Sequence, residues 1–287
     1  MKRIILPTDF SENAFNAISY ALKLFEKETC TFYLLHTFTP AAYYVGVNNV
    51  NTYSALKLEE IASQNSRREL DEVMLRIQEK FNNPKHTFVK RAVLNLLANE
   101  IVSLIEDEDI DLVVMGTKGA TGAKEVFIGT QTMYAIKKVR CPVIAVPSNF
   151  HYEAPKEILF ATDFKFDPEN RYLSMVQEMS QNHVARINVL NAYYGEPLSD
   201  AQEKNKDFLD SYFKATAHIF HTAEGVDVVA AIHEFQVKHK INFLVMIHNK
   251  HSFFENLLFK PVINQIAYHI NVPFLVIPSE KQLKSSN

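Results

Sequence analysis

Glycines and hydroxyl residues are concentrated in one stretch of this chain, at a spacing suited to holding phosphates. Gly116-Thr117-Lys118-Gly119 is followed after nine residues by Gly129-Thr130. Glycine reaches backbone angles closed to other residues, and it lets main-chain N–H groups approach an anion without a Cβ in the way. The chain has seven glycines in 287 residues, and four of them lie here: Gly116, Gly119, Gly122 and Gly129. An ordinary loop is the alternative, but the clustering favours a nucleotide-binding loop.

The segments on either side of this loop identify it as a strand-to-helix connection. Residues 111–115 are typical of a short buried strand, and residues 130–139, with Met133 and Ile136 on one face, predict a helix. Thr130 then begins that helix, where unpaired N–H groups and the helix dipole favour negative charge. The loop is therefore expected to bind the phosphates of a nucleotide.

Two motifs of this half of the chain resemble those of the universal stress protein family. The spacing Gly116-x-x-Gly119-x9-Gly129-Thr130, followed by the apolar run Cys141–Pro147, is similar to that family's ATP-binding signature. The opening Ile4-Ile5-Leu6-Pro7-Thr8-Asp9-Phe10-Ser11 is similar to its first strand and first turn. The resemblance implies a flavodoxin-like or Rossmann-like domain in a cytoplasmic, ATP-binding regulator of the stress response, without an established chemical reaction.

The composition agrees with a chain of about two globular domains. The chain has 287 residues, of which 47% are hydrophobic. Thirty basic and 33 acidic residues give a net charge of −3 with no basic stripe, which argues against a nucleic-acid partner. Cys30 and Cys141 lie far apart in the chain and do not indicate a disulfide framework. Neither a signal peptide nor a membrane-spanning run is predicted, so we expect a cytoplasmic protein with no membrane partner.

The chain contains an internal repeat. A shift of 131 residues places Asp111–Met115 on Asn242–Met246 and Cys141–Pro147 on Val272–Pro278, and a shift of 154 residues places Ile4–Phe10 on Ile158–Phe164. These matches predict a tandem duplication. Because the two shifts differ by 23, the second copy is 23 residues shorter, and the deletion is placed between the second and third strands.

Each copy alternates strands and helices, the pattern of a parallel sheet covered on both faces. We therefore expect an α/β fold of two tandem flavodoxin-like or Rossmann-like domains, each a five-stranded, mainly parallel sheet with helices on both faces. The expected boundaries are 1–148 for the domain with the intact loop, 149–155 for a linker, 156–279 for the second domain and 280–287 for a flexible tail. Strands of the first domain are predicted at 3–8, 31–38, 86–92, 111–116 and 142–147. Apolar stripes predict helices over 14–25 and 94–105.

The predicted site lies beyond the carboxyl ends of the strands, where sheets of this type bind ligands. The resemblance implies that Asp9 lies in the nucleotide site, where it accepts from ribose hydroxyls or an adenine edge; the alternative is a cap of the first helix. It also implies that Thr37 and Met115 lie beside the adenine. Lys118 is either a cationic phosphate contact or a solvated loop residue. The expected ligand is ATP, with Mg²⁺ associated through its phosphates, and the predicted binding residues are Pro7, Thr8, Asp9, Thr37, Met115, Gly116, Lys118, Gly119, Gly129, Thr130, Gln131 and Thr132.

The second copy keeps Thr162-Asp163 but loses the loop. At the shift of 131 residues, Gly116, Gly119, Gly129 and Thr130 become Ile247, Lys250, Lys260 and Pro261. Side chains at the glycine positions crowd the approach to the main chain, and proline contributes no N–H at the helix start. We interpret this half as degenerate, serving fold and assembly or binding an unknown ligand.

Neither a catalytic group nor a metal site is predicted. The histidine pairs His218-x-x-His221 and His248-x-x-His251 suggest zinc, but no cysteine or carboxylate accompanies either pair at ligand spacing. The main hypothesis is a nucleotide-responsive binding module. The alternatives are an enzyme that transfers from ATP or slowly hydrolyses it through Asp9 and a metal-bound water, and a scaffold that needs no nucleotide.

The last strand of each copy predicts how the chain assembles. Residues 142–146 and 273–277 are apolar, and proteins normally pair or cover such an edge. Since the resemblance implies dimerisation through this strand, we expect the two halves to form an internal pseudo-twofold pair, with a further homodimer as an option.

The segment Phe38–Tyr53 has no counterpart in the second copy and is predicted to cover the nucleotide site or an oligomer contact.

Overall fold

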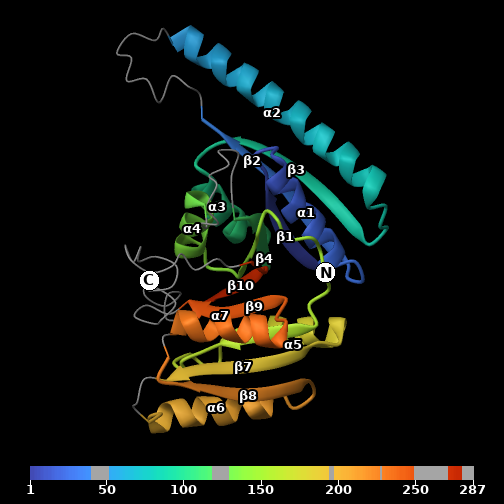
Figure 1. Cartoon of the computed structure of the whole chain (residues 1–287). Helices are drawn as coiled ribbons and strands as arrows, with labels where there is room; N and C mark the ends of the chain where they lie inside the picture. The colour runs from blue at the N-terminus through green and yellow to red at the C-terminus, as the bar shows by residue number, and fades with distance from the viewer. Residues whose placement is uncertain (40–51, 118–128, 194–196, 227, 249–270, 280–287) are drawn as a thin grey trace. The chain divides into compact units, whose positions relative to one another are not determined.

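The structure is a computed structural model, and it describes residues 1–39, 52–117, 129–193, 197–226, 228–248 and 271–279. The chain forms two compact units (Figure 1). The first comprises Met1–Lys124 and Gly129–Cys141, and the second comprises Glu125–Ile128 and Pro142–Asn287.

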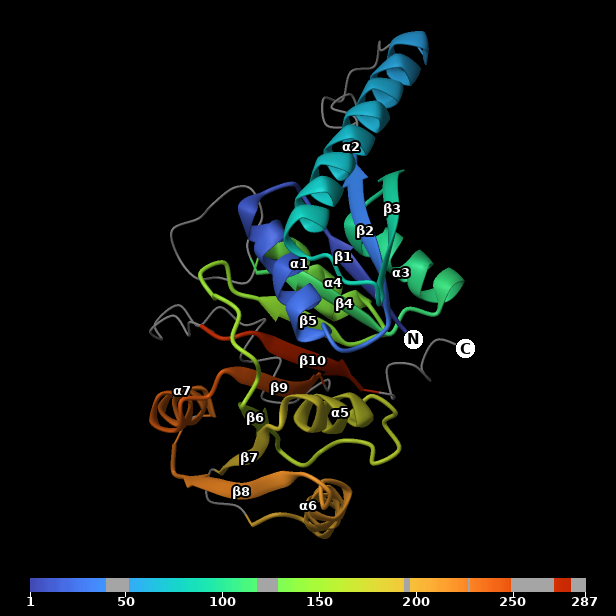
Figure 2. The ribbon, with the colours of Figure 1, turned by 90° about the vertical axis from the view of Figure 1, so that its right-hand side faces the viewer.

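The first unit is a parallel sheet with helices on both faces. Its elements are β1 (Lys2–Pro7), α1 (Glu12–Leu24), β2 (Cys30–Phe38), α2 (Thr52–Lys80), β3 (His86–Leu94), α3 (Leu97–Glu108), β4 (Leu112–Gly116) and α4 (Thr130–Lys138). The strand order is β3-β2-β1-β4. Helices α1 and α2 cover one face, and α3 and α4 cover the other (Figure 2). The chain therefore reverses its direction of strand addition between β1 and β4.

Helix α1 forms where the apolar stripe predicts it. The stripe residues are all buried: Ala14, Ala17, Ile18, Ala21, Leu22 and Phe25. Ser11 begins the helix, because its hydroxyl accepts the N–H of Ala14 at 3.2 Å. One residue of the other predicted helix is misassigned. Leu94 is the last residue of β3, because its pairing with Phe38 extends the β2–β3 ladder.

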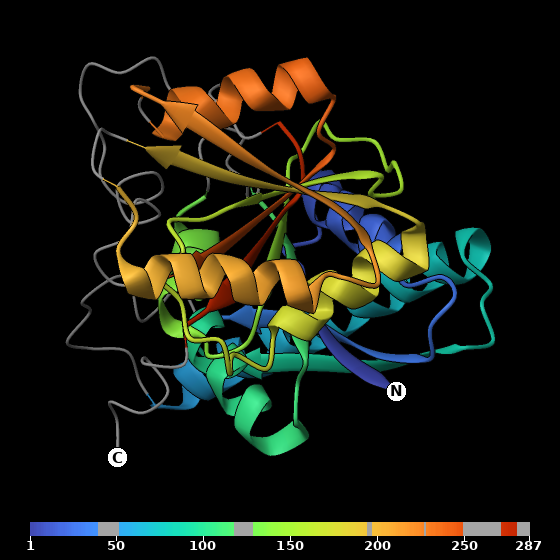
Figure 3. The same ribbon diagram turned by 90° about the horizontal axis from the view of Figure 1, so that it is seen from below.

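The second unit has the same plan. Its elements are β6 (Glu157–Ala161), α5 (Leu173–His183), β7 (Arg186–Tyr193), α6 (Asp200–Tyr212), β8 (Ala217–Glu224), α7 (Val228–His239), β9 (Phe243–His248), β10 (Phe274–Pro278) and, from the first copy, β5 (Val143–Val146). The order is β5-β10-β9-β6-β7-β8, with β5 antiparallel to β10 and the other pairs parallel. Helices α5 and α6 lie on one face and α7 on the other (Figure 3). The α/β class expected from the sequence is confirmed.

The strand registers follow the shifts of the sequence repeat. Ile4 pairs with Leu112 in the first unit, and Ile158 pairs with Phe243 in the second. These partners are related by the shifts of 154 and 131 residues. The length difference lies in the connection between the second and third strands, where α2 has 29 residues and α6 has 13. The extra length lets α2 project past the ends of β2 and β3 (Figure 2).

The last strands of the two copies pair with each other within the second unit. Residues 143–145 of β5 lie antiparallel to residues 274–276 of β10, and all six side chains are buried. This pairing satisfies the backbone groups of an apolar strand that would otherwise be a free edge. The strand pair is the one that the sequence predicts, whereas the pseudo-twofold arrangement of the two halves stays a prediction.

A helix end in the second unit provides a stability test with a matched control. Val184 ends α5 with φ 50° and is 83% exposed. A β-branched residue is strained in this left-handed region, which glycine adopts freely. We expect Val184→Gly to raise the free energy of unfolding by about 0.5–1 kcal/mol. Val237→Gly, at a 70% exposed site inside α7, is expected to lower it by about 0.5 kcal/mol. Urea unfolding that moves both midpoints in the same direction would contradict this account.

Candidate functional site

The switch point of the first sheet brings several predicted residues together. Strand β1 lies between β2 and β4, so the end of β1 at Pro7, Thr8 and Asp9 is next to the end of β4 at Met115 and Gly116. Neighbouring strands are about 4.8 Å apart. In open α/β sheets, ligands bind in the crevice where the strand order reverses. The β1–β4 boundary is therefore the candidate site.

The turn after β1 is fixed by contacts with the strand beside it. The N–H of Thr8 donates to the Leu35 carbonyl at 2.8 Å, and the Thr8 hydroxyl accepts the N–H of Phe10 at 3.0 Å. His36 Nδ1 donates to the Thr8 carbonyl at 2.8 Å, and its ring centroid is 4.3 Å from that of Phe10. Phe10 has φ 66°, which is uncommon for a bulky residue and marks a strained turn. His36 is a site residue that the sequence analysis missed.

Asp9 presents an exposed carboxylate at the end of β1. Its Oδ1 accepts the N–H of Ser11 at 3.1 Å and the hydroxyl of Ser11 at 2.6 Å. The N-cap of α1 is Ser11, so the alternative interpretation, in which Asp9 caps this helix, is wrong. Asp9 instead orients the residue that caps the helix.

The end of β4 is tied to the beginning of α4. The N–H of Gly129 donates to the Thr117 carbonyl, and the hydroxyl of Thr132 donates to the Gly116 carbonyl at 2.8 Å. Thr132 is 2% exposed, whereas Thr130 and Gln131 are exposed in the first turn of α4. The hydroxyl of Thr132 thus joins strand to helix, and its predicted phosphate contact stays a prediction.

The N-terminus of α4 has the properties of an anion site. Its N-cap is Gly129, and no side chain among the described residues caps the helix. The first N–H groups of a helix have no partner within it, and they carry the positive end of the helix dipole. An anion placed beyond Gly129 would therefore find donors and a favourable potential.

Thr117 adds a buried hydroxyl beside this helix end. It is 3% exposed, and its Oγ1 has no hydrogen-bond partner among the described residues. A buried hydroxyl without a partner costs about 1–3 kcal/mol. Thr117 directly follows β4 at the switch point, so it is a candidate ligand contact. Thr117 is absent from the predicted binding residues, although it lies within the motif Gly116-Thr117-Lys118-Gly119.

The remaining predicted residues have different positions. Lys118 and Gly119 lie outside the described residues. Met115 is the residue before the last one of β4, and its side chain is buried. Thr37 is half-buried on β2, one strand away from the switch point, and pairs with Val93 of β3.

The second unit repeats the turn of the first. The N–H of Thr162 donates to the Leu190 carbonyl at 3.0 Å, and the Thr162 hydroxyl accepts the N–H of Phe164 at 2.9 Å. Phe164 has φ 56°. Asn191 Nδ2 donates to the Thr162 carbonyl at 2.9 Å and so takes the part of His36. Both copies therefore build the same strand end from Thr-Asp-Phe.

The first histidine pair has separate partners. His218 Nε2 is 3.0 Å from the Asp210 carboxylate, and His221 Nε2 is 3.2 Å from Asn188 Oδ1. Across the described ranges, no three His, Cys, Asp or Glu side chains are grouped to hold a metal ion.

Among the residues that the structure describes, every helix is too short or too polar to cross a membrane.

The sequence and fold match known proteins of one family. The model of the universal stress protein family matches residues 1–147. Universal stress protein MJ0531 of Methanocaldococcus jannaschii is 29% identical over 151 residues, which cover 50% of this chain and 81% of that protein. Universal stress protein MJ0577 of the same organism is 30% identical over 155 residues, which cover 50% of this chain and 94% of that protein.

A solved structure shares the fold over nearly the whole length. The crystal structure of a universal stress protein from Archaeoglobus fulgidus has a TM-score of 0.64 and 15% identity, with 96% of each chain covered. This likeness shows the fold, and the match of the family model identifies the chain. It belongs to the universal stress protein family.

The strand-to-helix contact of Thr132 can be tested by removing its hydroxyl. Thr132→Val keeps the shape of the side chain but leaves the Gly116 carbonyl without its donor. We expect the free energy of unfolding to fall by about 1–2 kcal/mol, measured by urea denaturation. Thr132→Ser keeps the hydroxyl and is the control. If the valine variant were as stable as the serine variant, the contact would have no structural role.

Proposed function

We propose that the first unit binds ATP at the switch point between β1 and β4, with one site per chain. The observation that carries the proposal is the N-terminus of α4, which no described side chain caps and which directly follows the glycine loop. Family membership supports the proposal. The chain would then be a cytoplasmic, nucleotide-responsive regulatory module in the stress response.

The phosphates are assigned to the beginning of α4. Thr130 and Gln131 are exposed there, and Gly129 leaves the main chain accessible. The hydroxyl of Thr117 would gain the partner that it lacks among the described residues. Gly119 and Lys118 are proposed to complete the loop. Mg²⁺ is assigned to the phosphates themselves, since the described residues offer no cluster of three metal-binding side chains.

The nucleoside is assigned to the ends of β1 and β2. The Asp9 carboxylate is exposed and can accept from ribose hydroxyls or from an adenine edge. Its contacts with Ser11 hold one oxygen in place and so limit the entropy lost on binding. Met115 and Thr37 would lie on the adenine side, with the hydroxyl of Thr37 as a polar element in that contact.

Two other functions are distinguished by one set of measurements. An enzyme that transfers from ATP or slowly hydrolyses it would use Asp9 with a metal-bound water, and a scaffold would need no nucleotide. Mass spectrometry of ligand released from the purified protein, followed by a turnover assay, separates the three. Released ATP without turnover supports the binding module, turnover supports the enzyme, and absence of any bound or titratable nucleotide supports the scaffold.

Gly119→Val is expected to abolish ATP binding while the fold survives. The new side chain would stand between the main-chain N–H groups and the phosphates. Lys250→Val, at the equivalent position of the second copy, is the matched control and should leave ATP affinity unchanged. Isothermal titration calorimetry measures both, and circular dichroism checks the fold. Two equivalent sites in the parent protein, or parental affinity in Gly119→Val, would contradict the proposal.

The segment Phe38–Tyr53 is expected to respond to ATP. Residues 40–51 of this segment lie outside the described residues, and the prediction rests on its position after β2 and on its absence from the second copy. We expect ATP to slow proteolytic cleavage within it. Cleavage at the same rate with and without ATP, together with unchanged affinity and oligomeric mass after its deletion, would rule out both a cover and an assembly contact.

A further inference from the structure

The N-terminal part of α2 is a helical segment that the described residues of its own unit leave largely exposed. Helix α2 projects past the ends of β2 and β3 (Figure 2). Nearer its C-terminus the helix packs on these strands, and Leu70, Val73 and Ile77 are buried there. Of residues 56–68, which we call the arm, only Ser66 is buried. Because helices in proteins gain most of their stability from packing, the arm is suited to packing against a further partner.

Large apolar side chains are exposed on the arm. Leu56, Leu58 and Ile61 are 61%, 46% and 47% exposed. Single exposed apolar residues are ordinary on protein surfaces. Three of them within two turns of one helix instead indicate an interaction surface.

One face of the arm borders a hollow of about 420 Å³. The residues that line it are Leu56, Glu59, Glu60, Ser63, Gln64 and Arg67. They follow one another at the spacing of three and four residues that places side chains on one face of a helix. The small side chain of Ser63 lies in the middle of this face. A second helix can therefore approach closely at this point.

The charges on the arm are separated by sign along the helix. Glu59 and Glu60 precede Arg67 and Arg68 by about two turns. Side chains of one helix meet at spacings of three or four residues, so the acidic pair does not reach the basic pair of the same arm. Glu60 Oε1 accepts a hydrogen bond from Gln64 Nε2 at 3.3 Å. Among the described residues, none of the four charged side chains makes an ion pair.

A second copy of the arm complements this charge pattern. In an antiparallel pair of arms that is centred just after Ser63, Glu60 lies level with Arg67 of the partner subunit. Glu59 then lies level with Arg68 of the partner subunit. Twofold symmetry repeats both contacts. A parallel pair in register would instead set acid against acid and base against base, which is unfavourable.

We propose that the arm of α2 docks antiparallel on the arm of a second copy of this chain and forms a twofold dimer. The arm is about 20 Å long at 1.5 Å per residue, so the contact is at the low end of interface sizes. The dimer is therefore weak, with a dissociation constant on the order of 10 µM. It does not depend on the proposed ATP site.

Sedimentation equilibrium of the full chain without nucleotide measures this dimer. The dissociation constant is expected to rise at least about threefold between about 50 mM and about 500 mM NaCl, because salt screens exposed charges. A chain that stays monomeric at about 200 µM would overturn the proposal. A dimer that is insensitive to salt would overturn it as well.

Charge reversal tests the antiparallel arrangement. Glu59→Lys/Glu60→Lys makes the arm basic, and Arg67→Glu/Arg68→Glu makes it acidic. Each variant alone should associate with itself at least about tenfold more weakly, because like charges then face each other. An equimolar mixture of the two variants should form a heterodimer with the parental affinity, and all four changes in one chain should restore the homodimer. Losses without either restoration would overturn the proposal.

The matched control reverses two exposed charges away from the arm. Glu79 on α2 and Glu106 on α3 are exposed. Glu79→Lys/Glu106→Lys changes the net charge as much as Glu59→Lys/Glu60→Lys does, and it should leave the dimer unchanged. An equal loss in this control would show that net charge governs association, which contradicts the proposal. Circular dichroism checks that every variant is folded.

Two leucines of similar exposure test which part of α2 makes the contact. Leu56 is 61% exposed on the face that borders the hollow, and Leu75 is 59% exposed outside the arm. Leu56→Ser should weaken the dimer at least about threefold, and Leu75→Ser should not. Equal affinities in the two variants would place the contact elsewhere and overturn the proposal. If no ATP binds to the chain, these results still decide whether the arm forms a dimer.

Discussion

The threonine hydroxyl at the end of the first strand of each repeat makes the contact on which the turn at that strand end depends. Thr8 accepts the N–H of Phe10 at 3.0 Å, and Thr162 accepts the N–H of Phe164 at 2.9 Å. Each contact stabilises a phenylalanine at positive φ, which is otherwise costly. The chain can then leave the sheet sharply, and the aspartate between the two residues stays at the strand end. The turn thus positions a carboxylate at the switch point before any ligand contributes.

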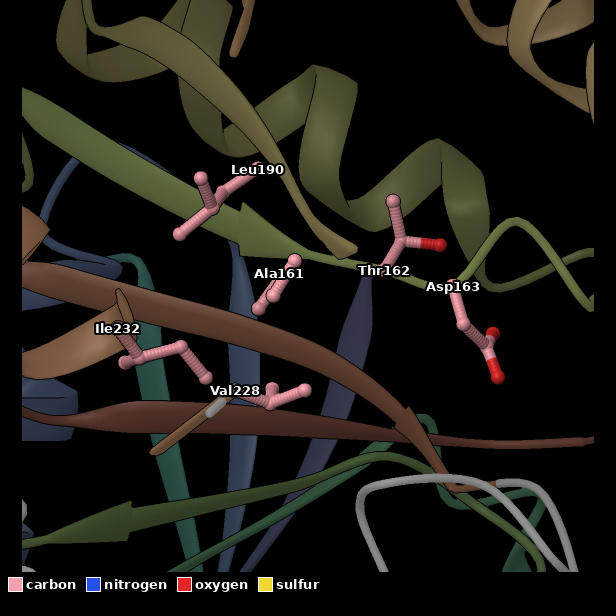
Figure 4. Close-up of a pocket in the computed structure, with 7 residues that line it drawn as sticks. Ala161, Thr162, Asp163, Leu190, Val228 and Ile232 are labelled. Atoms are coloured by element: carbon pink, nitrogen blue, oxygen red, sulfur yellow. The ribbon is translucent and has the colours of Figure 1, made fainter. Parts of the chain in front are cut away.

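The two repeats differ in what surrounds that carboxylate. In the first unit Asp9 is exposed, and the adjacent strand leads through a glycine loop to a helix that no described side chain caps. In the second unit Asp163 is half-buried beside an apolar cavity (Figure 4). Isoleucine and lysine replace the loop glycines there, and proline replaces the threonine. Backbone donors favour a charged ligand, whereas apolar walls favour an uncharged one. The divergence after duplication therefore changes the chemistry of the site while the strand end is retained.

Much of the fold could be predicted because burial leaves a strong pattern. Strands covered on both faces appear as continuous apolar runs, and the stripe from Ala14 to Phe25 matches a buried helix face. The contacts of the site were harder to predict. His36 and Thr8, which it contacts through the Thr8 carbonyl, are 28 residues apart in the sequence, and no local sequence pattern predicts this contact. Thr132 looks like a phosphate ligand in the sequence, but its hydroxyl faces the Gly116 carbonyl. The residues that line the cavity beside Asp163, such as Leu190 and Ile232, cannot be told from core residues by type.

Strand β5 belongs to the first copy of the repeat, but it lies in the second unit. Helix α4 begins at the proposed phosphate site and ends at Lys138, and β5 begins at Val143, five residues further along. Val139 and Cys141 in this connection are buried. Strand β5 then pairs with β10 inside the second unit. The first copy therefore contributes a strand to the sheet of the second unit, so the backbone groups of that strand are paired within one chain.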